Sequence, residues 1–203
     1  WEEGDLVCVL TCRVEVYQEP YPEPLVAVDV DSDGFIVVTG TANVAATVQG
    51  SPTVVEGPSG GLDAIQYGIG AFVQLGTDGV DTDSTWTIDC YIYSPMTIAP
   101  GLWGTMTRGR DGDHQIIVKN DGHELGGYEN AGRGFVGTGF MIDSLAEGWH
   151  RLTVSAGCGD ADCGTSQVIY YIDGAEVART DYMSETDFLA IGNYQDGQQP
   201  WRG

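Results

Sequence analysis

The fold of this chain is decided at residues 168–178, which read Val168-Ile169-Tyr170-Tyr171-Ile172-Asp173-Gly174-Ala175-Glu176-Val177-Ala178. Two runs rich in β-branched and aromatic residues flank the pair Asp173-Gly174. An Asp-Gly pair supplies the positive φ angles that a two-residue type I′ turn requires. The stretch therefore predicts a β-hairpin that turns at Asp173-Gly174.

Short runs of the same kind, separated by Gly and Asp turns, continue on both sides of this hairpin. They predict strands at residues 25–30, 35–39, 45–48, 71–75, 86–93, 115–119, 151–155, 167–172, 175–179 and 188–191. No window of 11 residues carries a convincing apolar stripe at helical spacing. The pattern favours an all-β, antiparallel two-sheet jelly-roll sandwich and excludes a parallel α/β fold.

Charge is the most extreme global property of the sequence. The 203 residues include 30 acidic and 8 basic ones, which gives a formal net charge of −22. Nucleic acid is excluded as a partner, because phosphate binding needs a clustered basic patch. No apolar run is long enough for a membrane span in this segment. We expect an extracellular or cell-surface location, in a saline environment where cations screen the acidic surface.

The proline-rich stretch at residues 19–24 predicts a boundary. Pro20, Pro22 and Pro24 make it stiff and unable to join a central strand. Residues 1–24 are therefore expected to be the end of a preceding module, or an edge strand, followed by a linker. Residues 25–203 are expected to form the main domain. Both ends of the chain are interpreted as cut, so that this segment belongs to a larger multidomain protein.

The sequence contains five cysteines, and because this number is odd, at least one is expected to be free or to pair outside this segment. Cys158 and Cys163 flank a four-residue turn and are expected to form a small disulfide. Cys90 shares a strand face with Trp86, Ile88 and Ile92, which favours a buried free thiol. For Cys8 and Cys12 two alternatives stay open, a bond to each other or to something outside this segment.

Four stretches in order resemble the signature of laminin-G-like and pentraxin-like domains. They are residues 147–154, 170–178, 189–193 and 199–203. The resemblance covers residues 25–203 and implies a concanavalin A-like, lectin-like jelly roll. The family usually adds one more strand after Gly203, so the resemblance also implies a domain truncated at its last strand.

Pentraxin-like members bind calcium through two loops, and the resemblance places four candidate ligands here. These are Asp111, Asp113, Gln195 and Asp196. Carboxylates, amides and carbonyls are the ligands that calcium takes. The sequence departs from the family at Gly112 and Tyr194, where the family has an amide and a carboxylate. The alternative interpretation is a pair of solvated acidic turns.

A second calcium candidate comes from the residues alone. Asp29, Asp31 and Asp33 alternate ahead of Gly34, as in the first half of an EF-hand loop. The second half is missing, because Gly40 stands where such a loop needs a bidentate Glu.

Catalysis has little support in the sequence, and we expect no enzyme. No nucleophile elbow is present, and His150, directly after Trp149, is interpreted as a packed structural residue. Tyr194, beside the predicted metal ligands, is the candidate for ligand contact. We therefore expect an extracellular adhesion module that recognises a glycan or a neighbouring protein with calcium support. The alternative is a structural building block of an extracellular fibre or cell-surface appendage, without sugar-binding activity.

Overall fold

A computed structural model of the chain describes residues 9–17, 24, 26–42, 44–58, 60–68, 70–77, 79–81, 86–96, 98, 103–157, 167–182 and 187–193, with the backbone alone at 9–17, 62 and 63. Within these ranges every regular element is a strand except one turn of 3₁₀ helix, η1 (Ile142–Ser144). None of the described elements is a helix long and apolar enough to cross a membrane. The prediction of an all-β fold is confirmed.

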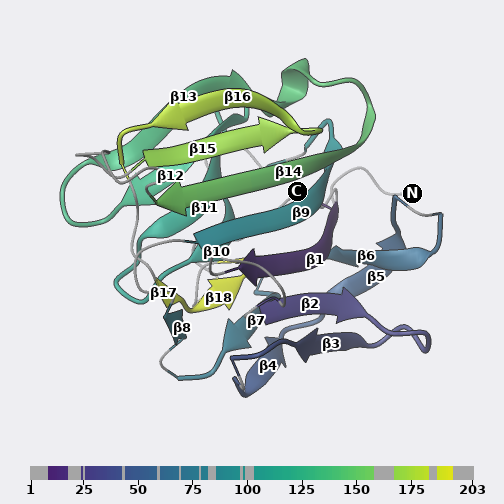
Figure 1. Cartoon of the computed structure of the whole chain (residues 1–203). Helices are drawn as coiled ribbons and strands as arrows, with labels where there is room; N and C mark the ends of the chain where they lie inside the picture. The colour runs from purple at the N-terminus through teal and green to yellow at the C-terminus, as the bar shows by residue number, and fades with distance from the viewer. Residues whose placement is uncertain are drawn as a thin grey trace.

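The larger sheet contains nine strands in the order β16-β15-β14-β9-β1-β2-β3, with β6 beside the first half of β1 and β5 beside β6 (Figure 1). All of its described pairings are antiparallel. Its strands are β1 (Val9–Tyr17), β2 (Val26–Val30), β3 (Ile36–Thr39), β5 (Thr53–Glu56), β6 (Leu62–Gln66), β9 (Trp86–Ser94), β14 (Gly148–Gly157), β15 (Gln167–Ile172) and β16 (Ala175–Thr180).

The second sheet contains seven strands in the order β13-β12-β11-β10-β18-β7-β4, again with antiparallel pairings. Its strands are β4 (Ala46–Gln49), β7 (Phe72–Leu75), β10 (Gly104–Arg108), β11 (His114–Lys119), β12 (Glu124–Glu129), β13 (Gly134–Met141) and β18 (Ala190–Ile191). A small third sheet pairs β8 (Val80–Asp81) with β17 (Asp187–Phe188).

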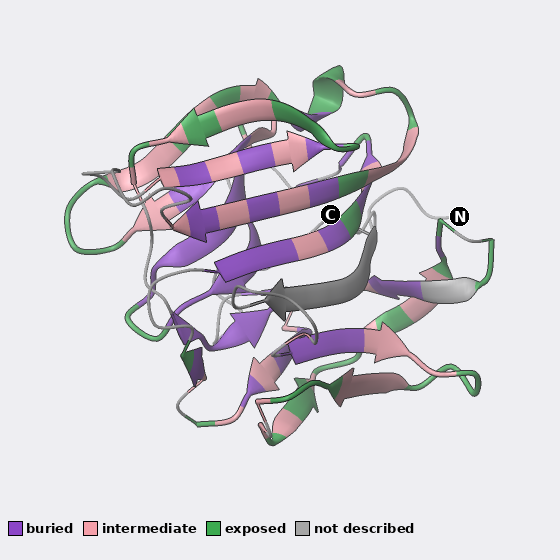
Figure 2. Cartoon of the chain, viewed as in Figure 1, coloured by how far each residue is buried: buried purple, intermediate pink, exposed green. Residues whose placement is uncertain are grey.

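The two larger sheets enclose one hydrophobic cluster, to which each contributes side chains that are almost fully buried. Ile88, Leu152 and Tyr170 come from the nine-stranded sheet, and Val73 and Ile116 come from the other. Along β14 and β15 buried residues alternate with half-exposed ones, as the striped strands in Figure 2 show. Because one face of each strand points inward, the fold is sandwich-like.

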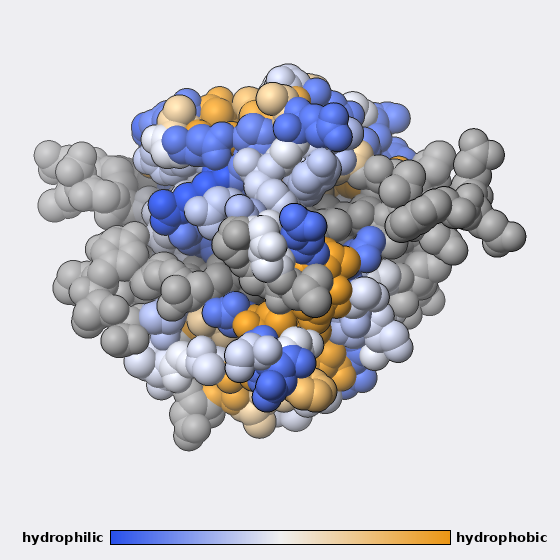
Figure 3. Space-filling view, turned by 90° about the vertical axis from the view of Figure 1, so that its right-hand side faces the viewer, coloured by the Kyte–Doolittle hydropathy of each residue, from blue (hydrophilic) through white to orange (hydrophobic). Residues whose placement is uncertain are grey.

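The sandwich is less completely buried where its edge strands β3 and β4 lie. Ile36 and Val38 of β3, and Val44 and Ala46 at β4, pack against the core but stay partly exposed. Figure 3 shows hydrophobic residues gathered in the lower half of one side of the molecule, at the height of β2, β3 and β4 in Figure 1. The opposite edges of the two sheets, β13 and β16, lie close together.

The hairpin predicted at Asp173-Gly174 is confirmed. Ile172 lies opposite Ala175, and the two residues between them have φ angles of 51° and 81°. Both values lie in the left-handed region that a type I′ turn uses. The carboxylate of Asp173 adds a tie to the neighbouring strand, because its Oδ1 accepts a hydrogen bond from the backbone N–H of Arg151 at 2.8 Å.

The first described strand differs from the prediction for residues 1–24. Instead of an edge strand or the end of another module, residues 9–17 form the interior strand β1. Val16 lies opposite Val26 of β2 on one side and opposite Ile88 of β9 on the other. Alternating β-branched residues such as Val14 and Val16 suit a strand with neighbours on both sides. The proline linker at residues 19–23 lies outside the described residues.

Candidate binding sites

The loop between β10 and β11 holds the first half of the predicted calcium site. Asp113 is 6% exposed, and each of its two carboxylate oxygens accepts a hydrogen bond from a distant part of the chain. Oδ1 accepts the backbone N–H of Asn130 at 2.8 Å, and Oδ2 accepts the Tyr182 hydroxyl at 2.7 Å. Asp111 is exposed, and its carbonyl accepts the Asn130 side-chain amide at 3.0 Å. Asp113 therefore connects three segments of the fold.

The second half of that site would follow β18. This strand runs antiparallel to β10, with Arg108 opposite Ala190 and the Gly192 N–H donating to the Met106 carbonyl at 2.8 Å. The chain thus passes toward the start of β10, whereas the loop with Asp111 follows its end. The described strands do not bring the two halves together. Tyr194, Gln195 and Asp196 lie outside the described residues, so the calcium site stays a prediction.

The second calcium candidate forms the turn between β2 and β3. Asp31 Oδ1 accepts the backbone N–H groups of Asp33 at 3.0 Å and Phe35 at 2.8 Å, and Gly34 has a φ of 81°. Asp29 Oδ1 accepts the N–H of Val30 at 2.8 Å. The carboxylates of Asp29 and Asp31 therefore accept local backbone N–H groups, as Asp side chains commonly do in turns. Across the whole described part of the chain, no three His, Cys, Asp or Glu side chains gather as a metal-binding group.

The structure confirms the prediction for Cys90 and does not test the prediction for Cys158 and Cys163. Cys90 is a free, buried thiol on the inward face of β9, as predicted, and burial followed by the charge of Asp89 raises the pKa of that thiol. An un-ionised buried thiol behaves as a small apolar group. Cys158 and Cys163 lie outside the described residues, and their disulfide stays a prediction.

His150 takes the structural position that was expected of it. Its Nδ1 lies 2.7 Å from Asp173 Oδ2, and its Nε2 lies 2.9 Å from the carbonyl of Ala146. The hydrogen bond to Asp173 raises the pKa of His150, with a smaller contribution from the Ala146 carbonyl. The imidazole therefore connects the start of β14 to the hairpin turn.

An aromatic surface that the sequence analysis did not single out lies on the outer face of the nine-stranded sheet. Tyr91 and Tyr93 alternate with the buried Cys90 and Ile92 along β9, so their side chains point away from the core. Trp149 of β14 lies directly opposite Tyr93. The two rings meet edge to face, with centroids 5.2 Å apart and an interplanar angle of 81°. Tyr91 is 39% exposed.

An ion pair lies beside these rings on the same face. Arg151, opposite Tyr91, donates from Nε at 2.9 Å and from Nη2 at 2.7 Å to the carboxylate of Asp89. Thr153 donates its hydroxyl to the same carboxylate at 2.7 Å. We call the five residues Asp89, Tyr91, Tyr93, Trp149 and Arg151 the β9–β14 face. The alternation of Tyr91 and Tyr93 with apolar residues is the signal that could have identified it from the sequence.

Trp103 and Tyr128 belong to a separate group of aromatic rings that pack against one another. Trp103 packs edge to face with Phe135 at 5.2 Å and with Tyr128 at 6.0 Å between ring centroids. Tyr128 in turn contacts the buried His114 at 5.6 Å. These rings form a packed cluster over β11, β12 and β13.

No family model, curated protein or solved structure matches this chain. Comparison with known proteins therefore does not identify the function of these sites.

Proposed function

We propose that this chain is an adhesion module of an extracellular or cell-surface protein, which binds a neighbouring protein through the β9–β14 face. The observation that carries the proposal is that the exposed Tyr91 and Arg151 lie with the half-buried rings of Tyr93 and Trp149 on one outward sheet surface. Trp, Tyr and Arg are the residues most enriched among the energetic centres of protein interfaces.

The ring geometry favours a protein over a glycan on this face. A sugar ring stacks on an aromatic face, and a chain of sugars needs several such faces lying in one plane. Tyr93 and Trp149 are nearly perpendicular instead, with an interplanar angle of 81°. Perpendicular rings leave an uneven surface that fits the side chains of a folded partner.

The charges of this chain indicate which kind of partner suits the β9–β14 face. Arg151 and Asp89 neutralise each other within the face, while the whole chain carries a formal net charge of −22. A suitable partner has a neutral, apolar centre surrounded by basic residues, because complementary charge speeds association and suppresses wrong partners. Its association rate should fall as salt rises, since salt screens the long-range attraction between exposed charges.

The proposal also includes a more specific fold for the two sheets. We infer a laminin-G-like jelly roll from the four sequence stretches that resemble that family, and two antiparallel sheets around one core support it. Calcium is proposed as a support of the loops through Asp111 and Asp113. The exposure of Asp111 and the acidity of the chain favour it, and the other two candidate ligands, Gln195 and Asp196, lie outside the described residues.

The test compares capture from cell-surface extracts by the unmodified chain and by three variants. Tyr91→Ala and Trp149→Ala remove rings from the β9–β14 face, and Phe35→Ala is the control, because Phe35 is 68% exposed but lies in the turn between β2 and β3. Each captured protein is then purified and titrated against all four chains. We expect at least tenfold weaker binding for the first two variants and unchanged binding for the control.

Two outcomes are decisive for the proposal. Equal affinities for all four chains would show that the face is not the binding surface. Concentration-dependent self-association in sedimentation, lost in Tyr91→Ala, would favour the alternative of a structural building block that assembles with copies of itself.

A further inference from the structure

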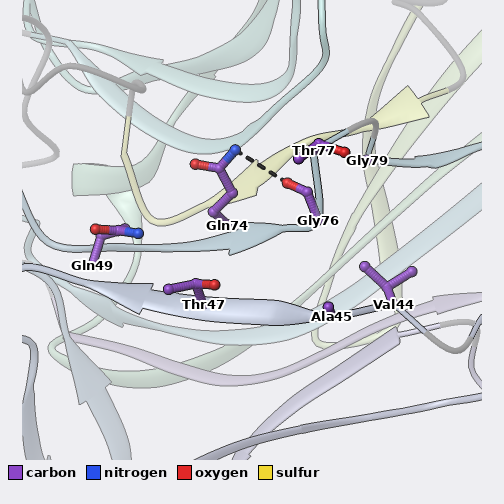
Figure 4. Close-up of a pocket in the computed structure, with 8 residues that line it drawn as sticks. All are labelled: Val44, Ala45, Thr47, Gln49, Gln74, Gly76, Thr77 and Gly79. Atoms are coloured by element: carbon purple, nitrogen blue, oxygen red, sulfur yellow. Dashed lines mark hydrogen bonds between the residues drawn. The ribbon is translucent and has the colours of Figure 1, made fainter.

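A separate pocket lies on the seven-stranded sheet, between β4, β7 and the turn that follows β7 (Figure 4). Its volume is about 550 Å³, within the range of small-molecule sites. The eight described residues that line it are Val44, Ala45, Thr47, Gln49, Gln74, Gly76, Thr77 and Gly79.

The strand register places the polar lining on the outer side of the sheet. Thr47 lies directly opposite Gln74, and the residues on either side of Gln74, Val73 and Leu75, are fully buried in the core. Thr47, Gln49 and Gln74 therefore share the outward face, because side chains alternate along a strand. Three hydrogen-bonding side chains thus converge over two adjacent strands.

The described lining residues carry no charged side chain; Asp78, in the turn after β7, lies outside the described residues. No described lining residue is Asp, Glu, Lys, Arg or His, although the chain has 30 acidic residues. Amide and hydroxyl groups both donate and accept hydrogen bonds. A ligand whose neutral groups also donate and accept hydrogen bonds can pair with these amides and hydroxyls without bringing a charge into the pocket. Sugar hydroxyls are such groups.

One of these side chains is already oriented. Gln74 Nε2 donates to the carbonyl of Gly76 at 3.1 Å, which fixes the amide plane and leaves Oε1 and the second N–H for a ligand (Figure 4). In the described part of the chain, the side chains of Thr47 and Gln49 have no hydrogen-bond partner. An oriented amide loses less freedom on binding than a mobile one.

Two of the lining residues, Gly76 and Gly79, have no side chain that could fill the pocket. Gly76 and Gly79 have φ angles of 63° and 74°, which other residues rarely adopt. A Cβ on Gly79 would lie 2.6 Å from the carbonyl oxygen of Phe188, and a Cβ on Gly76 would lie 3.4 Å from a methyl group of Val44. At these two positions the chain therefore passes close to its neighbours without a side chain that would fill the pocket.

From this convergence we propose that the pocket between β4 and β7 binds a short, uncharged saccharide. Thr47, Gln49 and Gln74 hydrogen-bond its hydroxyls, and Val44 and Ala45 contact its apolar C–H surface. The site is separate from the β9–β14 face and uses a different sheet. The chain then recognises a neutral sugar independently of its protein partner.

The test titrates the chain with neutral mono-, di- and trisaccharides of glucose, galactose, mannose and N-acetylglucosamine, followed by ligand-observed NMR. Glucuronic acid and sialic acid are the charged comparators. The variants are Thr47→Val, which keeps the β-branched shape but removes the hydroxyl, and Gln49→Leu and Gln74→Leu, which remove the amides. Tyr91→Ala serves as the control for the other face.

We expect binding of at least one neutral saccharide, at least tenfold weaker binding in Thr47→Val and Gln74→Leu, and no change in Tyr91→Ala. Circular dichroism verifies that each variant keeps its strands. The proposal is overturned if no neutral saccharide binds, if the acidic sugars bind more tightly, or if folded pocket variants bind as well as the unmodified chain. None of these results depends on whether the β9–β14 face binds a protein.

Discussion

Tyr182 donates its hydroxyl to Oδ2 of Asp113 at 2.7 Å, and so joins the end of β16 to the loop between β10 and β11. The same carboxylate accepts the N–H of Asn130. This contact lies where β13 and β16 bring the two sheets together, and Arg133 packs over the Tyr182 ring at 5.5 Å. A residue expected to serve calcium thus holds two layers of the protein together.

Replacing Asp113 should therefore destabilise the protein even without metal. We expect Asp113→Ala to lower the free energy of unfolding by about 1.5–3 kcal/mol, because two donors lose a buried charged acceptor. Asp111→Ala, at an exposed position of the same loop, should change it by less than about 0.5 kcal/mol. Urea denaturation of both variants in a chelating buffer measures the difference. Equal midpoints for the two variants would contradict the assigned role.

Calcium should raise the melting temperature if the loop between β10 and β11 binds it. A ligand at 100 times its dissociation constant stabilises the folded state by about 2.7 kcal/mol. Asp111→Ala should lose most of that increase, while Asp31→Ala, in the turn between β2 and β3, should retain it. The measurement is thermal melting with calcium and with chelator. Coinciding curves for the unmodified chain would rule out a stabilising site.

Lowering the pH should reduce the free energy of unfolding, because His114 is buried. Burial, followed by the charge of Arg108, lowers the pKa of this imidazole to about 4. The folded state therefore binds fewer protons than the unfolded state, whose imidazole has a pKa near 6.5, and stability should fall between about pH 6.5 and 4. The full loss is on the order of 3 kcal/mol. His114→Gln should flatten this part of the pH profile, and an unchanged slope in denaturation at several pH values would contradict the assignment.

The pair of His150 and Asp173 should stabilise the hairpin only within a pH window. Their hydrogen bond raises the pKa of His150 and lowers that of Asp173. The Asp173 contribution is present above its unfolded pKa near 4 and lost in stronger acid, and the His150 contribution is lost as pH rises above about 6.5. Asp173→Asn keeps a residue suited to the turn but removes the charge. We expect it to abolish a contribution of up to about 1 kcal/mol at pH 5–6, with little effect at pH 8. Urea denaturation at pH 5.5 and pH 8 measures both, and equal losses at the two values would contradict the charged pair.

A fragment that begins at residue 25 should fail to fold. It lacks β1, which lies between β9 and β2 and also pairs with β6. Removing an interior strand leaves two unpaired edges inside one sheet. Size-exclusion chromatography and proteolysis of residues 25–203 provide the test, with residues 1–203 as the control. A compact, protease-resistant fragment would show that β1 is dispensable.

The sequence predicted the parts of the fold that depend on neighbouring residues. The turn at Asp173-Gly174 and the inward face of β9 with Trp86, Ile88 and Ile92 follow from local turn chemistry and alternation, and both are confirmed. Strands β12 and β13 were missed because glycines interrupt their apolar pattern. A Cβ at Gly126 would collide with the carbonyl of Val136 and the ring of Phe135, so that position is explained only by the partner strand.

The candidate sites were harder to predict for a related reason. Asp111 and Asp113 share the loop between β10 and β11, but whether another loop reaches them depends on the direction of β18 beside β10. The β9–β14 face depends on the pairing of strands more than 50 residues apart, at Tyr93 and Trp149. The spacing of residues along the chain gives neither relationship.

The interior position of β1 also sets an order of events during synthesis. Residues 9–17 leave the ribosome before β9, which pairs along one side of β1. β9 follows roughly 70 residues later, which takes several seconds at about 5–20 residues per second. During that interval the nascent strand can pair with β2 but leaves its other edge open to other chains. The acidic character of the chain opposes such contacts, because like-charged nascent chains repel one another.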